Sequence, residues 1–139
     1  MDIKDTGVEL YEWNEPGYKP LVFHQDWMVA LLNWEPACLL ENAHEIERHN
    51  LTDEVFLLLH GQAILYVNAG AGLRSIAMKP GALYNVRAGV WHNLLATRDA
   101  RWVIVEARGT DLHDTEIRKL NEEERLVLFS APLAWAKCV

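Results

Sequence analysis

The chain has 139 residues, half of them apolar, and its 20 acidic against 13 basic residues give a formal net charge of −7. This composition predicts a single domain over residues 1–139 with a sizeable core, and excludes a disordered chain. No cluster of Lys or Arg stands out, which disfavours nucleic acid or an acidic membrane as a partner. The first residues lack the apolar core of a secretion signal, no apolar run is long enough for a membrane span, and there is no CxxC motif. We therefore expect a reduced, cytoplasmic protein.

Short strand-like segments, separated by Gly, Pro and Asn turns, follow one another along most of the chain. Beginning with an alternating segment near the N-terminus, the expected strands cover residues 7–13, 20–23, 27–34, 54–60, 62–67, 73–78, 82–86, 90–95 and 102–107. Residues 37–46 fit either a loop or a short helix. This rhythm is typical of an antiparallel β-sandwich or barrel, so the expected fold class is all-β.

Only the C-terminal part of the chain has a helical pattern. Asn121, followed three residues later by Glu124, resembles a capping box ahead of an apolar segment. The tail at residues 132–135 is apolar and must be covered, either by its own barrel or by a second subunit. This tail and the open strand edges of a barrel favour a homodimer.

The segment at residues 47–61 is the most informative in the sequence. In an extended strand Glu47 and His49 point to the same face, because they are two residues apart. Glu54 then opens an apolar run that ends at Gly61. Both faces of this run are apolar, so we expect the strand to be buried on both sides. A carboxylate at the edge of such a strand is costly unless it is hydrogen-bonded, paired or bound to a metal.

His92 lies on a later strand and is a candidate to join His49 and Glu54. Two imidazoles and a carboxylate form an ordinary coordination shell for zinc, iron, manganese or nickel, with positions left for water or substrate. Spacing alone does not establish the site, because only a closed barrel brings residue 92 beside residue 49.

Two motifs in this region resemble those of the cupin superfamily. The first, G-x5-H-x-H-x3,4-E-x6-G, is matched at His49, Glu54 and Gly61. The second, G-x5-P-x-G-x2-H-x3-N, is matched at Gly81, Gly89 and His92. The chain departs from the motifs at four positions, which hold Glu41 for the leading glycine, Glu47 for the first histidine, Arg87 for the proline and Ala96 for the asparagine.

The resemblance implies a cupin-type double-stranded β-helix, or jelly-roll barrel, followed by the short C-terminal helix. It also implies that the His and Glu positions hold a divalent metal inside the barrel. Because a carboxylate can ligate a metal, the expected ligands are Glu47, His49, Glu54 and His92. Two alternatives stay open: Glu47 points away and leaves three ligands, or the barrel has lost its metal.

Each candidate also has a purely structural interpretation. His49 and His92 can be polar side chains satisfied inside a barrel, and Glu54 can face solvent. The other histidines, at positions 24, 44, 60 and 113, are expected to be structural or exposed. Trp91 must project away from His92 and is expected to pack. Arg74 could hold a substrate carboxylate or phosphate, although an outward orientation is favoured.

Three functions remain compatible with this pattern. The first is a metal-dependent enzyme acting on a small organic acid, sugar or related molecule. The second is a small-molecule binding module without chemistry. The third is a metal-free isomerase or epimerase of cupin type, which requires a His with a Tyr or carboxylate partner. No such pair is marked outside the two motifs. The fold alone does not decide among them.

Overall fold

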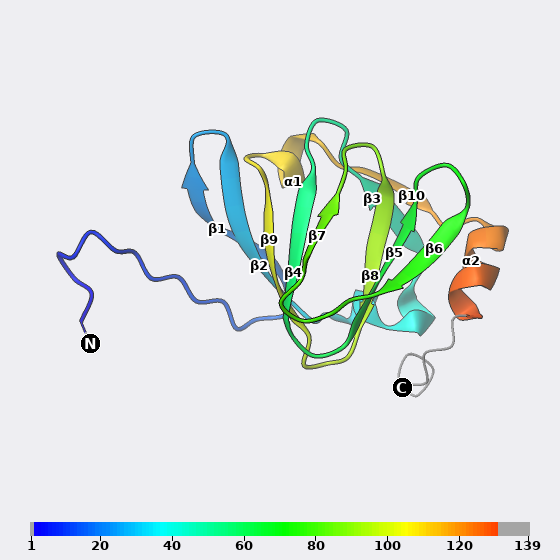
Figure 1. Ribbon diagram of the computed structural model, residues 1–139, viewed down its shortest axis with the longest axis horizontal. Helices are drawn as coiled ribbons and strands as arrows, with labels where there is room; N and C mark the ends of the chain where they lie inside the picture. The colour runs from blue at the N-terminus through cyan, green and yellow to red at the C-terminus, as the bar shows by residue number, and fades with distance from the viewer. Residues whose placement is uncertain (1, 131–139) are drawn as a thin grey trace.

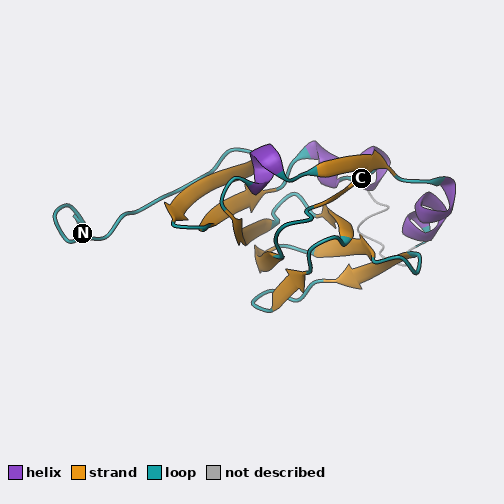
Figure 2. Ribbon diagram, turned by 90° about the horizontal axis from the view of Figure 1, so that it is seen from above, coloured by secondary structure: helices purple, strands orange, loops and turns teal. Residues whose placement is uncertain are grey.

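The computed structural model describes residues 2–130, which form two antiparallel five-stranded sheets packed face to face (Figure 1). In spatial order, the first sheet contains β1 (Gly17–His24), β2 (Trp27–Asn33), β9 (Arg101–Ala107), β4 (Glu54–His60) and β7 (Leu83–Val86). The second contains β10 (Glu116–Lys119), β3 (Glu45–Arg48), β8 (Trp91–Ala96), β5 (Ala63–Asn68) and β6 (Leu73–Ala77). The expected all-β barrel of jelly-roll type is confirmed, and Figure 2 shows it along a second direction.

Side-chain alternation along the strands builds the core between the two sheets. On β4, Phe56 and Leu58 point inward, and on β9 Trp102 and Ile104 do the same, all of them at most 3% exposed. Burying such side chains contributes about 2 kcal/mol each. The site described below lies at the open end of this core.

The prediction that residues 54–60 are buried on both faces is wrong. The inward residues of β4 are buried, whereas Val55 and Leu57 are half-buried and Leu59 is 48% exposed. No helix among the described residues packs on the outer face of this sheet. The apolar side chains on that face therefore reach partial burial only from their neighbours on β7 and β9.

The predicted strand over residues 7–13 is also wrong. These residues have no strand partner and form an arm that extends away from the barrel (Figure 1). Val8 and Leu10 are more than 60% exposed. Trp13 attaches the arm, because its indole N–H donates to the Gly17 carbonyl at 3.0 Å and its carbonyl accepts from the Asn33 amide at 3.0 Å. Alternation describes the side chains of this segment but supplies no neighbouring strand.

Several short elements lie between and beside the strands, and helix α2 packs against β6. They are the 3-10 turns η1 (Pro36–Cys38) and η2 (Leu40–Asn42), helix α1 (Thr110–His113) and helix α2 (Glu122–Phe129). The two 3-10 turns lie almost entirely within residues 37–46, for which the sequence fitted either a loop or a short helix. The predicted capping box on α2 is present in both directions between Asn121 and Glu124. Both α1 and β10 were missed by the sequence patterns. The apolar tail at 132–135 lies outside the described residues.

Candidate metal site

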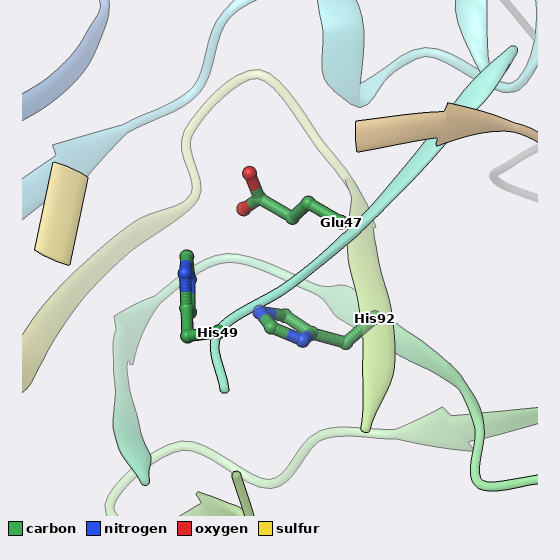
Figure 3. A group of neighbouring side chains, drawn as sticks. All are labelled: Glu47, His49 and His92. Carbon is green, nitrogen blue, oxygen red and sulfur yellow. The ribbon is translucent and has the colours of Figure 1, made fainter. Parts of the chain in front are cut away.

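Five acidic and imidazole side chains from both sheets meet inside one end of the barrel. Glu47 on β3 is paired with His92 on β8, and His49 directly follows β3. Glu54 begins β4 and Glu106 lies near the end of β9. Val55 of β4 pairs with Val105 of β9, so the residues next to them, Glu54 and Glu106, are also neighbours. Figure 3 shows the carboxylate of Glu47 and the two imidazoles directed at a common space.

The four residues predicted from the motifs therefore lie together, with Glu54 between the imidazoles. Glu54 Oε1 is 2.8 Å from His92 Nε2 and 3.3 Å from His49 Nε2. Potential ligand atoms of Glu47, His49 and His92 all lie within 4.8 Å of one another. Glu47 thus faces the cluster instead of pointing away.

Both imidazoles are oriented from behind by backbone carbonyls. His49 Nδ1 lies 2.8 Å from the Asp114 carbonyl oxygen, and His92 Nδ1 lies 2.9 Å from the Val90 carbonyl oxygen. A carbonyl oxygen can only accept, so each Nδ1 carries hydrogen and donates. Each Nε2 is then directed into the cluster, with a lone pair when the ring is neutral. Metal-binding histidines are held in this way.

Two aspartates outside the cluster fix the segment between His49 and Glu54. The Asp114 carboxylate accepts the backbone N–H groups of Asn50 at 3.0 Å and Leu51 at 2.8 Å. Asp53 accepts the backbone N–H of Ala88 at 2.9 Å, and this bond connects the first motif to the turn before His92. These three hydrogen bonds fix the loop between His49 and Glu54 and the turn before His92.

Glu106 and Tyr18 are site residues that the sequence interpretation missed. Potential ligand atoms of Glu106, His49 and Glu54 form a second group within 4.8 Å. The Tyr18 hydroxyl donates to Glu106 Oε1 at 2.5 Å, whereas Glu106 Oε2 has no hydrogen-bond partner among the described residues. A signal for Glu106 existed, since it shares strand parity with Trp102 and Ile104 and so must point inward. Tyr18 carried no comparable signal.

The neighbouring carboxylates are driven to opposite protonation states. Burial alone would raise the pKa of Glu54, but hydrogen bonds from His49 and His92 lower it to about 2. Burial and the adjacent charge of Glu54 raise the pKa of Glu106 to about 8. Burial would lower the pKa of His49, yet its bond to Glu54 raises it to about 9. Without a metal, the cluster therefore contains an ionised Glu54, a protonated Glu106 and a protonated His49 near neutral pH.

A cavity of about 340 Å³ adjoins the cluster and reaches the surface between η1, α1 and β10. The apolar part of its lining includes Leu32, Phe56 and Ile104, and the polar cluster forms much of the rest. Its size is in the range of small-molecule sites. Cys38 also lines the cavity, but burial raises the pKa of its thiol to about 11, so it is not a thiolate near neutral pH.

The remaining candidates lie outside this cavity. The histidines at positions 24, 44, 60 and 113 are exposed. Trp91 packs between the guanidinium groups of Arg48 and Arg118, at 4.5 and 4.7 Å from its ring centre, which agrees with the predicted structural role. Arg74 is exposed on β6 and does not line the cavity.

The donor set fits a divalent metal ion. Two imidazole Nε2 atoms, the shared carboxylate of Glu54 and flanking oxygens of Glu47 and Glu106 match the nitrogen and oxygen ligands of zinc, iron, manganese or nickel. The buried Oε2 of Glu106 has no hydrogen-bond partner in the described part of the chain and lies 3.8 Å from His49 Nε2, so it is available to a cation.

No protein-family model and no curated protein matches the sequence. Solved structures do match its fold. A cupin-2 domain protein from Shewanella frigidimarina is 23% identical, with a TM-score of 0.51 over 69% of this chain and 85% of that chain. Pac13, a nucleoside dehydratase, is 14% identical, with a TM-score of 0.55 over 80% of this chain and 86% of that chain.

Two further structures agree with these. KdgF from Halomonas sp. is 14% identical, with a TM-score of 0.52 over 71% of this chain and 86% of that chain. A variant of the Streptomyces Pac13 protein with uridine is 13% identical, with a TM-score of 0.54 over 84% of this chain and 96% of that chain. Together with the two matched motifs, these structures identify the chain as a cupin-fold β-barrel.

Proposed function

We propose that the protein binds one divalent metal ion through His49, His92 and Glu54, and that it binds and transforms a small polar organic molecule in the adjoining cavity. The observation that carries this proposal is the orientation of the two imidazoles. Both Nδ1 atoms are tied to backbone carbonyls, so both Nε2 atoms converge on one carboxylate oxygen. Glu47 and Glu106 lie close enough to complete the site.

A bound divalent ion would supply Lewis-acid activation of an oxygen of the bound molecule. The chain's own residues contribute orientation and proton transfer. Phe56 and Ile104 exclude water from one wall of the cavity. Glu106, with its carboxyl proton held beside Tyr18, can give a proton to a bound molecule and take it back, because its pKa of about 8 is close to neutral.

Metal content tests this proposal directly. Untagged protein is analysed for metals as purified, after chelation, and after reloading with Zn²⁺, Mn²⁺, Fe²⁺ or Ni²⁺. We expect about one ion per chain. His49→Ala and His92→Ala should lose it, whereas His60→Ala should keep it because that imidazole is 70% exposed and faces only Asp99. A wild-type protein that takes up none of the four ions contradicts the proposal.

A second candidate, metal-free acid–base chemistry, is favoured by the contact between Tyr18 and Glu106. A tyrosine and a carboxylate 2.5 Å apart, with His49 Nε2 3.8 Å from the same carboxylate, form the kind of partner set that such an isomerase or dehydratase needs. Uridine and related nucleosides are the first compounds to try, because the similar Pac13 is a nucleoside dehydratase. Turnover that survives complete chelation and is lost in Tyr18→Phe would favour this candidate.

We also propose a homodimer in the cytoplasm. Exposed apolar side chains on β7 and β10, Leu83 and Ile117, lie on edge strands that a second copy could cover. The free thiol of Cys38 fits a reducing compartment. Light scattering of the 15.9 kDa chain tests the first point, and a monomer at micromolar concentration contradicts it. Cell fractionation tests the second. No helix among the described residues is long and apolar enough to span a membrane.

A further inference from the structure

The cavity beside the cluster has a one-sided charge. Five carboxylates line it, those of Glu35, Glu47, Glu54, Glu106 and Asp111. No Lys or Arg among the described residues lines it. Even with two positive charges from a divalent ion and a proton on Glu106, four carboxylates leave the cavity negative. An anionic group placed there meets repulsion in a partly desolvated setting, where charge interactions are strong.

The unpartnered oxygen of Glu106 adds a second, independent constraint. This side chain is 5% exposed, faces the cavity, and has Oε1 occupied by the Tyr18 hydroxyl and Oε2 unsatisfied in the described part of the chain. A buried oxygen without a hydrogen-bond partner is costly, so a ligand that supplies one gains affinity: a donor when Glu106 is ionised, an acceptor when Glu106 is protonated. A ligand hydroxyl group can fill either role.

Apolar side chains beside the acids favour a ligand with an apolar face. Phe56 and Ile104 each lie two residues from an acid of the cluster on the same strand, and with Leu32 they line the same cavity. A ring with hydroxyl or amino groups along one edge can contact both the acids and these carbon atoms.

We infer that the ligand is an uncharged or cationic ring compound rich in O–H or N–H donors, such as a nucleoside or an unoxidised sugar, and not an organic acid or a phosphate ester. This inference deepens the proposed function, on which it rests for the location of the ligand. It narrows the substrate classes that the sequence left open by removing the organic acids.

Matched ligand pairs that differ in one anionic group test the inference. Dissociation constants are measured by titration calorimetry for uridine against uridine 5′-monophosphate and for galactose against galacturonate, on metal-free and Zn²⁺-loaded protein. We expect the neutral member to bind at least about tenfold more tightly in at least one pair. Ala37→Trp, which places a bulky ring at the exposed rim of the cavity, should abolish that binding.

Charge variants test whether the preference comes from the carboxylates of the cavity or from the net charge of the whole protein. In Glu35→Gln/Asp111→Asn the preference for the neutral member should fall at least about threefold. Glu9→Gln/Glu12→Gln changes the net charge equally on the N-terminal arm and should leave the preference unchanged. Tighter binding of the anionic member, no binding by any of the four compounds, or an equal effect of both double variants would overturn the inference. If the protein takes up no ion but still prefers the neutral member of a pair, the ligand inference stands and the metal proposal fails.

Discussion

The metal-free protein should lose stability as the pH rises, and Glu54→Gln should remove the part of that loss that comes from His49. His49 has a folded-state pKa of about 9 against an ordinary value of 6.5, because Glu54 stabilises its protonated ring. A raised pKa of a base contributes stability that is complete below pH 6.5 and disappears as the pH passes 9. Glu106 acts in the same direction, because its pKa is raised from 4.5 to about 8 and its part of the stability is lost as the pH passes 8. Burial is the largest cause of that shift, so this part remains in Glu54→Gln.

The magnitude follows from the His49 values. A pKa of about 9 instead of 6.5 corresponds to about 3 kcal/mol of unfolding free energy, present at pH 6.5 and largely absent above pH 9. For a domain of this length that is a fall of roughly 10 °C in Tm. In Glu54→Gln the imidazole loses its main charged partner, burial opposes its charge, and only the Asp114 carbonyl and Glu106 still favour it, so we expect the His49 part of the change to fall below about 1 kcal/mol.

The unfolding free energies of the wild type and of Glu54→Gln are measured by urea denaturation in chelator at pH 6.5 and pH 9. Unfolding is followed by the fluorescence of the six tryptophans. His60→Ala is the control, because that exposed ring lies outside the cluster and should leave the wild-type pH dependence intact. Equal wild-type stability at the two pH values, or the same loss in Glu54→Gln, would refute the account of the cluster. Adding a bound metal should reverse the trend, since deprotonated ligands bind it better.

Two further predictions concern stability away from the cluster. A Cβ at Gly61 would lie 2.7 Å from the Ala100 Cα at a φ of +83°, whereas Gly81 has a φ of +84° and open space. Gly61→Ala should therefore cost at least about 2 kcal/mol more than Gly81→Ala, which should cost about 1 kcal/mol, and equal costs in urea titrations would contradict this reasoning. Arg118 lowers the pKa of Glu124 to about 2, so the stability it contributes above pH 4.5 is lost as the pH falls towards 2. Thermal melts between pH 5 and 2.5 should show a smaller loss for Glu124→Gln, and matching profiles would count against the ion pair.

The sequence predicted those parts of the fold that depend on local pattern. Eight of the expected strands are present because inward and outward side chains alternate and turn residues separate them. The prediction of a capping box at Asn121 is confirmed because it also depends on local sequence: its partner, Glu124, is three residues away. The arm at residues 7–13 failed because a strand needs a neighbour, which its own sequence cannot supply. β10 was missed because its Glu116–Lys119 segment is mostly polar and is held by pairing with β3.

The same distinction applies to the site. The motif spacing located His49, Glu54 and His92, and the geometry places Glu47 with them. Glu106 was missed, although its inward parity on an apolar strand was visible in the sequence. The contact between Tyr18 and Glu106 joins residues 88 positions apart and depends on how β1 and β9 lie in the folded sheet. No spacing rule could have supplied it.

The distribution of the cluster over both sheets has a consequence for how the barrel assembles. Glu54 and Glu106 come from one sheet, and Glu47 and His92 come from the other, while His49 follows directly after β3. None of these donors meets a donor of the opposite sheet until the sheets have closed, so an unfolded or half-folded chain offers no complete site. An ion bound there would link the two sheets and slow their separation. The lifetime of the folded barrel would then depend on metal supply, even in a variant whose cavity no longer binds a small molecule.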